Sequence, residues 1–255
     1  MPQEKKSLIT GLLSTQRVSD GITRMKFSWH GAKPRAGQFF MVKPCVSSTF
    51  LARPVSAAAA GTGSVTFFIA GKGRGTRELI DMRKGQSACL TGPLGNCWND
   101  FRAGGVKQKN DTDRKIALVS GGVGIAPLFA FAAELSVSRS KNFDFFAGFK
   151  DGNTVLNVKD ACIVTEDGSE GKKGLVTDYV DTSKYSAVYS CGPLPMMHAL
   201  YNKCNKTNTP LFISMEANMA CGVGACLGCT IKTINGNKRC CADGPVFPAG
   251  EIFYE

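Results

Sequence analysis

Five of the eleven cysteines in this 255-residue chain lie close together near its C-terminal end, and no other feature limits the fold as strongly. Cys221, Cys226 and Cys229 form a C-x4-C-x2-C loop, and Cys240 and Cys241 follow further along the chain. Thiols at this spacing act together only if one tight loop forms and a second segment returns to it. The region must therefore fold as a compact unit around its sulfur atoms.

The spacing of the three loop cysteines matches the plant-type order of ligands to a two-iron, two-sulfur cluster. The fourth ligand is then Cys240 or Cys241, and the spacing alone does not choose between these adjacent residues. A tetrahedral zinc site also takes four thiolates, although zinc sites more often pair two short C-x2-C units. Free thiols are the third alternative. We predict a 2Fe-2S cluster, whose chemistry is the transfer of single electrons.

An odd number of cysteines that includes a metal-ligand pattern indicates a reducing compartment. The first six residues lack the apolar core of a secretory signal, and no apolar run approaches the roughly 20 residues of a membrane span. We therefore expect a cytoplasmic protein with no membrane segment. The other six cysteines are predicted to be small buried side chains, and they are Cys45, Cys89, Cys97, Cys162, Cys191 and Cys204.

The formal net charge of +11 suits an anionic partner, such as a phosphate-bearing cofactor, an acidic protein surface or nucleic acid. No basic run interleaved with aromatic residues and no nucleic-acid-binding motif accompanies this charge. Surplus Lys and Arg also serve simply to keep a surface solvated. Nucleic-acid binding is therefore not expected.

Residues 1–101 are predicted to form an antiparallel barrel of short strands, with no convincing helical stripe among them. Met25, Phe27 and Trp29 alternate with polar residues at the period of a strand. The other short apolar runs, bounded by Gly and Pro, are Gln38–Val42, Val65–Ala70 and Ser87–Leu90.

Residues 102–114 are polar and charged, and we expect a linker there. Residues 115–214 alternate strand candidates with helix candidates, which indicates a mostly parallel, doubly wound sheet. Residues 215–255 hold the cysteine loop, a hairpin around Asn235 and a short tail, and we expect a small subdomain. The strand candidates are Ile116–Ser120, Phe143–Gly148, Ala161–Thr165, Ala187–Ser190 and Leu211–Ser214. The helix candidates are Ala126–Val137, Val176–Val180 and Pro195–Cys204.

Two loops that follow strand candidates in residues 115–214 are candidates for nucleotide binding. The glycine-rich loop Ser120–Leu128 opens a helix, and amides at a helix N-terminus suit a dinucleotide pyrophosphate, although the G-x-G-x-x-G fingerprint is absent. The loop Ser190–Met196 follows a strand end, where ligands bind in open α/β sheets, so Cys191 could face a nicotinamide ring. Each loop is otherwise an ordinary strand-to-helix turn. The candidate residues are Gly121, Gly122, Gly124, Pro127, Cys191, Gly192 and Pro193.

The barrel part contains two polar, glycine-rich interruptions of its apolar strands, Arg53–Ser56 and Gly71–Thr76. A guanidinium and a nest of backbone amides are suitable ligands for a second diphosphate. Each segment could equally be a hairpin turn with a solvated Arg, so neither is specific alone.

Along the chain, the two barrel segments come first, then the loop Ser120–Leu128, the loop Ser190–Met196 and the cysteine loop. This order resembles the ferredoxin–NAD(P) reductase superfamily, in which a flavin-binding barrel precedes a nucleotide-binding α/β domain. The loop Cys221–Cys229 and the ending Cys241–Phe247 are similar to those of the electron-transfer subunits of NAD-linked dihydroorotate dehydrogenase B. The resemblance covers essentially the whole chain, including Gly92–Asn96 and Val164–Ser169. It implies a six-stranded antiparallel FAD barrel, a doubly wound NAD domain and a small 2Fe-2S subdomain.

The resemblance also implies a role for each matching residue. Arg53 would face the FAD diphosphate and Ser56 the isoalloxazine ring. Cys241 would be the fourth cluster ligand, because the ligand in this family stands two positions before the Asp-Gly-Pro that begins here at Asp243. The implied FAD residues are Arg53, Pro54, Val55, Ser56, Phe68, Ile69, Ala70, Gly75 and Thr76. The implied cluster ligands are Cys221, Cys226, Cys229 and Cys241.

By this resemblance, an FMN-containing catalytic subunit oxidises dihydroorotate to orotate in pyrimidine biosynthesis, and a heterotetramer of the two subunit types is implied. Electrons pass one at a time through the cluster of this chain to FAD, which delivers them to NAD+ as hydride. The alternative is an NAD(P)H-linked diaphorase subunit that serves a hydrogenase, a sulfide-handling enzyme or a ferredoxin. It stays open because the chain carries no dihydroorotate-binding residues of its own.

The residues after the second strand of the sheet bear on the choice between NAD and NADP. Asp151 would favour an unphosphorylated ribose and Lys150 a phosphate, and the resemblance favours NAD. No carboxylate–His pair stands out as a general base, and His198 is expected on a helix surface.

A cluster that exchanges electrons with another protein must expose one edge to it. We therefore expect residues 219–229 and the tail Phe247–Tyr254 to lie at an interface with the partner subunit.

Overall fold

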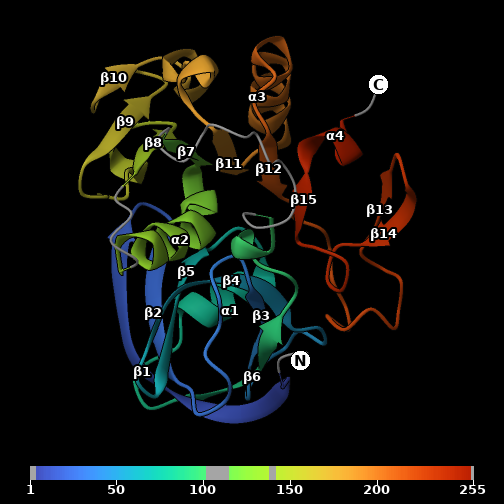
Figure 1. Ribbon diagram of the computed structural model, residues 1–255. Coiled ribbons are helices and arrows are strands. Elements are labelled where there is room, and N and C mark those ends of the chain that lie inside the picture. Colours follow the sequence, from blue (N-terminus) through green and yellow to red (C-terminus); the bar gives the residue numbers. More distant parts are fainter. Residues whose placement is uncertain (1–3, 102–114, 138–141, 254–255) are drawn as a thin grey trace.

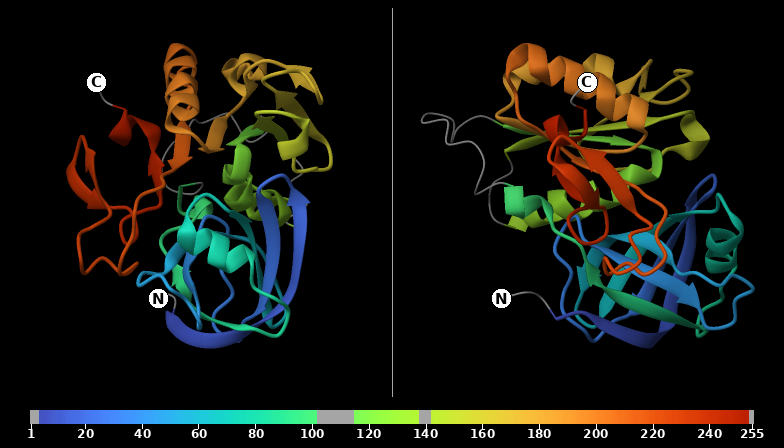
Figure 2. Two further views of the ribbon diagram at one scale, coloured as in Figure 1. Left: turned by 180° about the vertical axis from the view of Figure 1, so that it is seen from behind. Right: turned by 90° about the vertical axis from the view of Figure 1, so that its right-hand side faces the viewer.

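The computed structural model describes residues 4–101, 115–137 and 142–253, so the expected linker, residues 102–114, lies outside the described residues. Three parts lie beside one another in Figure 1: a closed barrel, a seven-stranded sheet with helices, and a C-terminal region that includes a two-stranded hairpin. The two further views in Figure 2 place the C-terminal region against both the barrel and the sheet.

The barrel is antiparallel and closes in the strand order β1-β2-β5-β4-β3-β6, which confirms the prediction of a six-stranded antiparallel barrel. Its interior takes alternate residues of the strands, and Phe27, Phe40 and Phe67 are completely buried there. Phe40 meets Phe67 edge to face, with 5.5 Å between ring centroids. The strands are β1 (Lys6–Ser19), β2 (Ile22–Ser28), β3 (Phe39–Pro44), β4 (Arg53–Gly61), β5 (Ser64–Ala70) and β6 (Ser87–Leu94).

Two details of the barrel differ from the sequence-based expectation. Arg53–Ser56 is not an interruption between strands, because it is the beginning of β4 and pairs with β3. A short helix, α1 (Arg74–Ile80), follows β5 although no helical stripe is visible in the sequence. Only Gly75 and Leu79 of this helix are buried, so its apolar face is too small to be recognised as a pattern.

The sheet has the order β10-β9-β8-β7-β11-β12-β15, and its strands are parallel except for β15, which pairs antiparallel with β12. The chain moves outward from β7 in one direction and then returns to place β11 on its other side. Ligands bind outside the carboxyl ends of the strands at such a switch point. The strands are β7 (Ile116–Gly121), β8 (Phe143–Phe149), β9 (Ala161–Thr165), β10 (Lys172–Lys173), β11 (Ala187–Cys191), β12 (Leu211–Ser214) and β15 (Val246–Pro248).

Helices cover both faces of this sheet, which confirms the doubly wound prediction. Leu118, Tyr189 and Phe212 pack on the side of α2 (Ile125–Val137), and their neighbours along the strands pack on the side of α3 (Leu194–Thr207). The expected helix Val176–Val180 is only a 3-10 turn, η4 (Val176–Tyr179). The other 3-10 turns are η1 (Trp98–Phe101), η2 (Gly122–Gly124), η3 (Gly152–Thr154) and η5 (Thr182–Lys184).

The C-terminal region contains the predicted hairpin, formed by β13 (Thr230–Thr233) and β14 (Gly236–Arg239), and a short helix, α4 (Ala249–Ile252). It is not separate from the sheet, because β15 is the edge strand next to β12 and Phe247 is buried in the same core as Ile213. His198 is exposed on α3, as expected, and its ring packs against Phe253.

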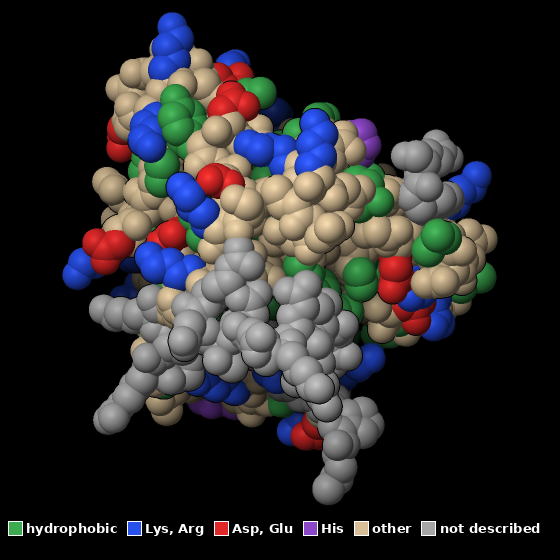
Figure 3. Space-filling model, turned by 45° about the horizontal axis from the view of Figure 1, so that its top comes forward, with side chains coloured by type: hydrophobic (Ala, Val, Ile, Leu, Met, Phe, Trp, Pro, Cys, Tyr) green, Lys and Arg blue, Asp and Glu red, His purple; other side chains and the backbone are tan. Residues whose placement is uncertain are grey.

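Helix α2 joins the barrel to the sheet. The indole Nε1 of Trp98 donates to Pro127 O (3.2 Å), and the carboxylate of Glu134 accepts from the Ala36 amide (2.8 Å). On the face shown in Figure 3, Lys and Arg side chains are scattered with Asp and Glu among them. None of the helices in the described residues combines the length and the apolar character that a membrane span needs.

Candidate redox site

A cavity of about 640 Å³ lies between the barrel and the carboxyl ends of β7 and β11. Its position is the switch point of the sheet, where the topology predicts a ligand. The volume lies within the range of roughly 300–1,000 Å³ that is usual for ligand pockets. The barrel, the loops of the sheet and the segment after β12 all contribute to its wall.

The barrel wall of this cavity contains eight of the nine residues that the sequence predicts for FAD, from β4, β5 and α1. The ninth, Gly75, lies directly beside the guanidinium of Arg53, where a Cβ atom would collide with it. Arg53 Nη1 donates a hydrogen bond to Leu51 O (2.9 Å). The side chain of Ile69 packs in the barrel core. The eight residues are Arg53, Pro54, Val55, Ser56, Phe68, Ile69, Ala70 and Thr76.

The sheet contributes three of the residues that the sequence predicts for NAD, namely Gly124, Pro127 and Cys191. The remaining four, Gly121, Gly122, Gly192 and Pro193, are not part of the cavity wall. The two predicted loops nevertheless touch, because β7 and β11 are neighbours and a Cβ atom at Gly124 would collide with Cys191 O. Such close backbone approach explains why glycine stands at this position.

The segment after β12 also forms part of the cavity wall, and the sequence analysis did not predict this. Its residues continue from the sheet along the cavity and then enter the cysteine loop two residues before Cys221. Only their position after a strand end could have pointed to them, because the segment itself has no motif. The wall residues are Ser214, which ends β12, and then Met215, Glu216, Ala217, Asn218 and Met219.

The thiol of Cys191 is buried in the cavity wall and remains protonated. Desolvation raises its pKa far above the usual range, and the carboxylate of Glu216 raises the pKa further. Cys191 is therefore a neutral, compact group on the sheet side of the cavity and not a thiolate nucleophile.

The cysteine loop lies on the outside of the barrel. A Cβ atom at Gly222 would stand 2.5 Å from Met41 Cγ on β3 and 3.2 Å from Leu94 Cδ1 on β6, so the loop backbone is seated directly on these strands. Arg239 connects the loop to the return segment, which we define as Asp243–Val246. Its Nη1 donates to Gly224 O (3.3 Å), and its Nη2 forms an ion pair with the Asp243 carboxylate (3.0 Å).

The four predicted ligands form an outer and an inner pair. Cys226 is exposed and Cys221 is partly exposed, whereas Cys229 and Cys241 are buried. The amides of Cys226 and Val223 donate to Cys221 Sγ, each at 3.4 Å, and these bonds lower the pKa of Cys221 to about 6. The Cys241 amide donates to Cys229 Sγ at 3.5 Å.

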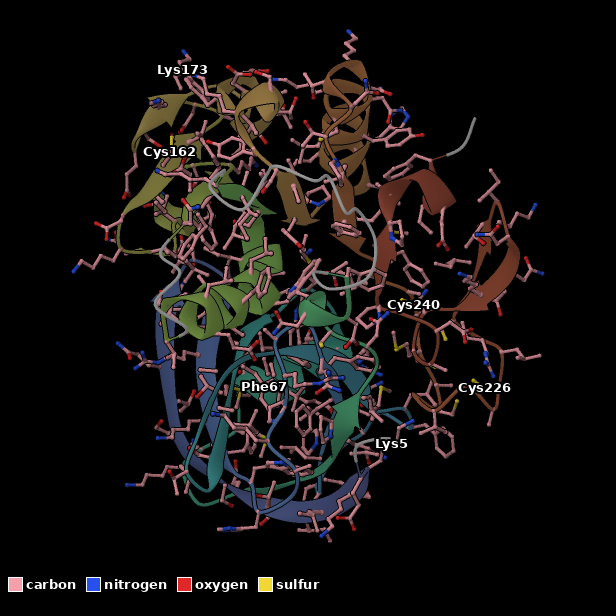
Figure 4. The ribbon with its side chains drawn as sticks, viewed as in Figure 1. Lys5, Phe67, Cys162, Lys173, Cys226 and Cys240 are labelled. Carbon is pink, nitrogen blue, oxygen red and sulfur yellow. The ribbon has the colours of Figure 1, made fainter. Side chains whose placement is uncertain are left out.

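Cys240 and Cys241 point in different directions. The Cys240 thiol is buried and donates to Met215 O at 3.2 Å, on the side of the sheet. The Cys240 amide donates to Cys229 O (3.0 Å), and the thiol of Cys241 lies near Cys229 and Cys221. Figure 4 shows Cys240 near β15 and Cys226 in the outer part of the loop.

The sulfur atoms and amides of this loop fit a two-iron cluster. Among the described residues, no three His, Cys, Asp or Glu side chains meet at one point to hold a metal ion. A 2Fe-2S cluster does not need such a point, because each of its two irons takes two protein ligands. The N–H groups directed at Cys221 and Cys229 are of the kind that tune such clusters.

Comparison with known proteins adds a family to this geometry. The family described as the iron-sulfur cluster binding domain of dihydroorotate dehydrogenase B matches residues 216–253. The chain is 38% identical over 254 residues to the dihydroorotate dehydrogenase B (NAD(+)) electron transfer subunit of Clostridium acetobutylicum, covering 98% of each chain. It is 40% identical to the corresponding subunit of Clostridium perfringens, over 88% of this chain and 89% of the relative.

Solved structures with the same fold are more distant in sequence. An NADH-dependent reduced ferredoxin-NADP oxidoreductase structure aligns with a TM-score of 0.81 at 23% identity, over 95% of this chain and 89% of that chain. A ferredoxin reductase of carbazole 1,9a-dioxygenase aligns with a TM-score of 0.66 at 19% identity, over 82% of this chain and 68% of that chain.

The barrel, the switch-point cavity and the cysteine loop together give a ferredoxin reductase-like fold with an iron–sulfur region, and the relatives show that the chain is an oxidoreductase subunit. The relatives then make the assignment more specific. The chain belongs to the family of electron transfer subunits of dihydroorotate dehydrogenase B (NAD(+)).

Proposed function

We propose that this chain carries electrons from an FMN-containing dihydroorotate dehydrogenase catalytic subunit to NAD+, by way of a 2Fe-2S cluster and FAD. One observation carries the proposal: the segment Ser214–Met219 lines the cavity and runs directly into the cysteine loop. Both cofactor sites are thereby joined by a single short stretch of backbone. The names of the relatives favour this partner over a hydrogenase, a sulfide-handling enzyme or a ferredoxin.

The cluster would be held by Cys221, Cys226, Cys229 and Cys241, and it would supply single-electron exchange. The direction of the Cys240 thiol, which donates to Met215 O, supports Cys241 as the fourth ligand. The buried inner pair keeps water from one side of the site, and the exposed outer pair leaves the other side accessible.

FAD would occupy the barrel side of the cavity and would exchange hydride with the nicotinamide while exchanging single electrons with the cluster. Arg53 would bind its diphosphate, and the side chains of Ser56 and Phe68 would contact the ring system, whereas the Val55 side chain packs in the barrel core. The nicotinamide would enter from the carboxyl ends of β7 and β11, where Pro127 and the neutral Cys191 thiol shape the wall.

The partner subunit would cover the outer edge of the cysteine loop. Val223 and Leu227, with 46% and 62% of their surface exposed, flank the exposed Cys226 there. Phe247, the first residue of the expected interface tail, is buried in the core of this chain instead, and Tyr254 lies outside the described residues. We propose a cytoplasmic heterotetramer of two copies of each subunit type.

We propose NAD as the nucleotide on the evidence of the relatives. Asp151 caps η3, because its Oδ1 accepts from the Thr154 amide (3.1 Å), so part of its carboxylate is used within the chain. The exposed Lys150 would be the residue nearest to a 2′-phosphate in the sequence-based hypothesis. NADH and NADPH should therefore be compared directly as electron donors.

The test uses protein purified without oxygen. Iron, sulfide, zinc and flavin are assayed, and NADH is added to see whether both the flavin and the iron–sulfur absorbance bleach. The purified chain is then mixed with an FMN-containing dihydroorotate dehydrogenase subunit, and orotate formation is followed with NAD+ as acceptor. Protein that contains zinc in place of iron contradicts the proposal, and bleaching without orotate formation supports the diaphorase alternative.

A further inference from the structure

We propose that Asn96 is a positioning residue that fixes the cysteine loop's return segment against the FAD cavity and so sets the rate of electron passage between the two sites. The inference rests on the proposed function, since it assumes that a cluster and a flavin exchange electrons. It concerns a residue that touches neither cofactor site directly.

Asn96 lies between β6 and η1 and makes four hydrogen bonds to the return segment Asp243–Val246. Its side-chain amide pairs with Val246 in both directions, since Oδ1 accepts from Val246 N (2.9 Å) and Nδ2 donates to Val246 O (2.8 Å). Nδ2 also donates to Asp243 O (3.3 Å), and the Asn96 amide donates to Gly244 O (2.7 Å). The Asn96 side-chain amide thus pairs with the N–H and C=O of Val246 in the way that the backbone of a neighbouring strand would.

The return segment is connected to the proposed cluster ligand Cys241, to the cavity wall and to β12. It begins two residues after Cys241, the proposed inner ligand. Pro245 lines the cavity, and its carbonyl accepts from the Met215 amide (2.9 Å). Val246 pairs with Ser214 at the end of β12. A shift of this segment would therefore move the cluster ligand relative to the cavity wall.

The packing next to Asn96 leaves little room for adjustment. Gly95 has φ +77°, and a Cβ atom there would stand 2.5 Å from Pro245 Cδ and 2.8 Å from Gly244 O. Phe39, another cavity residue, lies on the same side at 3.1 Å from that position. The loop Gly95–Asn96 is therefore fitted closely to the return segment, and the Asn96 amide holds the two together.

Rates that depend on the placement of two groups change steeply with small displacements. Electron transfer between two centres slows as the distance between them increases, so a shift of the return segment would slow the exchange between cluster and flavin. Because the hydrogen bonds that Asn96 makes in the described residues all go to the return segment and none to β4, β5 or α1, its loss should slow exchange between the two cofactors and leave the hydride step with NADH unchanged.

The experiment compares Asn96→Ala and Asn96→Asp holoprotein with the wild type and with Asn202→Ala, an exposed asparagine on α3. Anaerobic rapid mixing with NADH resolves flavin reduction from the later bleaching of the cluster. Hydrogen–deuterium exchange reports on the Val246 amide, which donates to Asn96. Asn96→Asp retains the acceptor for that amide and loses both donated bonds.

We expect cluster bleaching to be severalfold slower in Asn96→Ala, with the rate of flavin reduction and the KM for NADH unchanged and the Val246 amide exchanging faster. Asn202→Ala should match the wild type in all four measurements. The inference is overturned if both Asn96 variants bleach at the wild-type rate, or if the hydride step slows equally. If Asn96→Ala does not retain its cluster, the rates of cluster bleaching and flavin reduction in Asn96→Asp test the inference. Wild-type protein without flavin or cluster would contradict the proposed function instead.

Discussion

The cysteine loop and the FAD cavity are built in opposite ways. The loop collects its four proposed ligands from one stretch, Cys221 to Cys241, and all four ligands are cysteines. The wall of the cavity is formed by residues as far apart in the sequence as Phe39 and Pro245. Most of these residues would contact a cofactor without forming a strong individual bond to it. A metal centre is therefore concentrated in a few strong bonds, whereas a cofactor cavity shares its binding among many weak contacts.

The largest effect is expected where one sulfur atom is removed from the cluster site. Cys241→Ser should abolish iron and sulfide binding and leave the flavin in place, because the buried inner pair would lose one thiolate. Cys240→Ser is the matched control, and it should retain the cluster since the Cys240 thiol donates to Met215 O. Iron, sulfide and flavin contents per chain measure both. If Cys240→Ser lost the cluster and Cys241→Ser retained it, Cys240 would be the fourth ligand.

The cavity should respond more gradually, and Arg53→Gln tests this. Loss of hydrogen bonds to a charged diphosphate costs about 1.5–3 kcal/mol, so the Kd for FAD should rise about ten- to a hundredfold. Arg24→Gln is the control, because Arg24 is exposed on β2 and bonds to Gln16 outside the cavity. Titration of the apoprotein with FAD measures both variants. Complete loss of FAD binding would show that the cavity depends on one residue as strongly as the cluster does.

The backbone of the cysteine loop should have a smaller effect than its sulfur atoms. Gly224 and Gly236 both have positive φ, +85° and +90°, so Gly→Ala strains either position. Only at Gly224 does the added Cβ meet another atom closely, Ala242 Cβ at 2.9 Å, beside Cys241. Gly224→Ala should assemble the cluster but lose its visible absorbance faster in air. Gly236→Ala should lower only the stability to urea, and equal bleaching of the two would contradict a steric role for Gly224.

The same contrast explains what the sequence could predict. The cysteine pattern is local, so the loop and the hairpin after it were recognisable from spacing and from Asn235-Gly236. The loops after β7 and β11 were also recognisable, because glycine and proline follow apolar strands there. The resemblance to a known superfamily added the residues of β4 and β5, which carry no specific motif of their own.

Features that depend on distant packing could not be predicted from pattern. β4 was hidden because Ala57–Ala60 shows no alternation, although β3 and β5 complete its pairing. β15 is three residues long and becomes a strand only because β12 offers an edge. Glu216 and Asn218 belong to the cavity wall because the barrel lies opposite the end of β12. No local signal describes that juxtaposition.

The smallest expected effect lies in the loop that precedes β4. The Glu78 carboxylate on α1 accepts from the hydroxyls of Ser47 (2.5 Å) and Ser48, and these bonds lower its pKa to about 2. Because this pKa is below the unfolded value of 4.5, the stabilisation is fully present above pH 4.5 and is lost as the pH falls towards 2. The effect is small since solvent screens the group.

Glu78→Gln should therefore lower the Tm slightly at pH 7, and the difference from the wild type should shrink between pH 4.5 and pH 2. Thermal unfolding at several pH values measures it, and a difference independent of pH would contradict the role of the charge. FAD affinity and iron content should stay at wild-type levels, because Glu78 contributes to neither site. If FAD affinity fell as far as in Arg53→Gln, the loop Ser47–Thr49 would be positioning Arg53, and the cavity would extend its shared binding into a segment that does not line it.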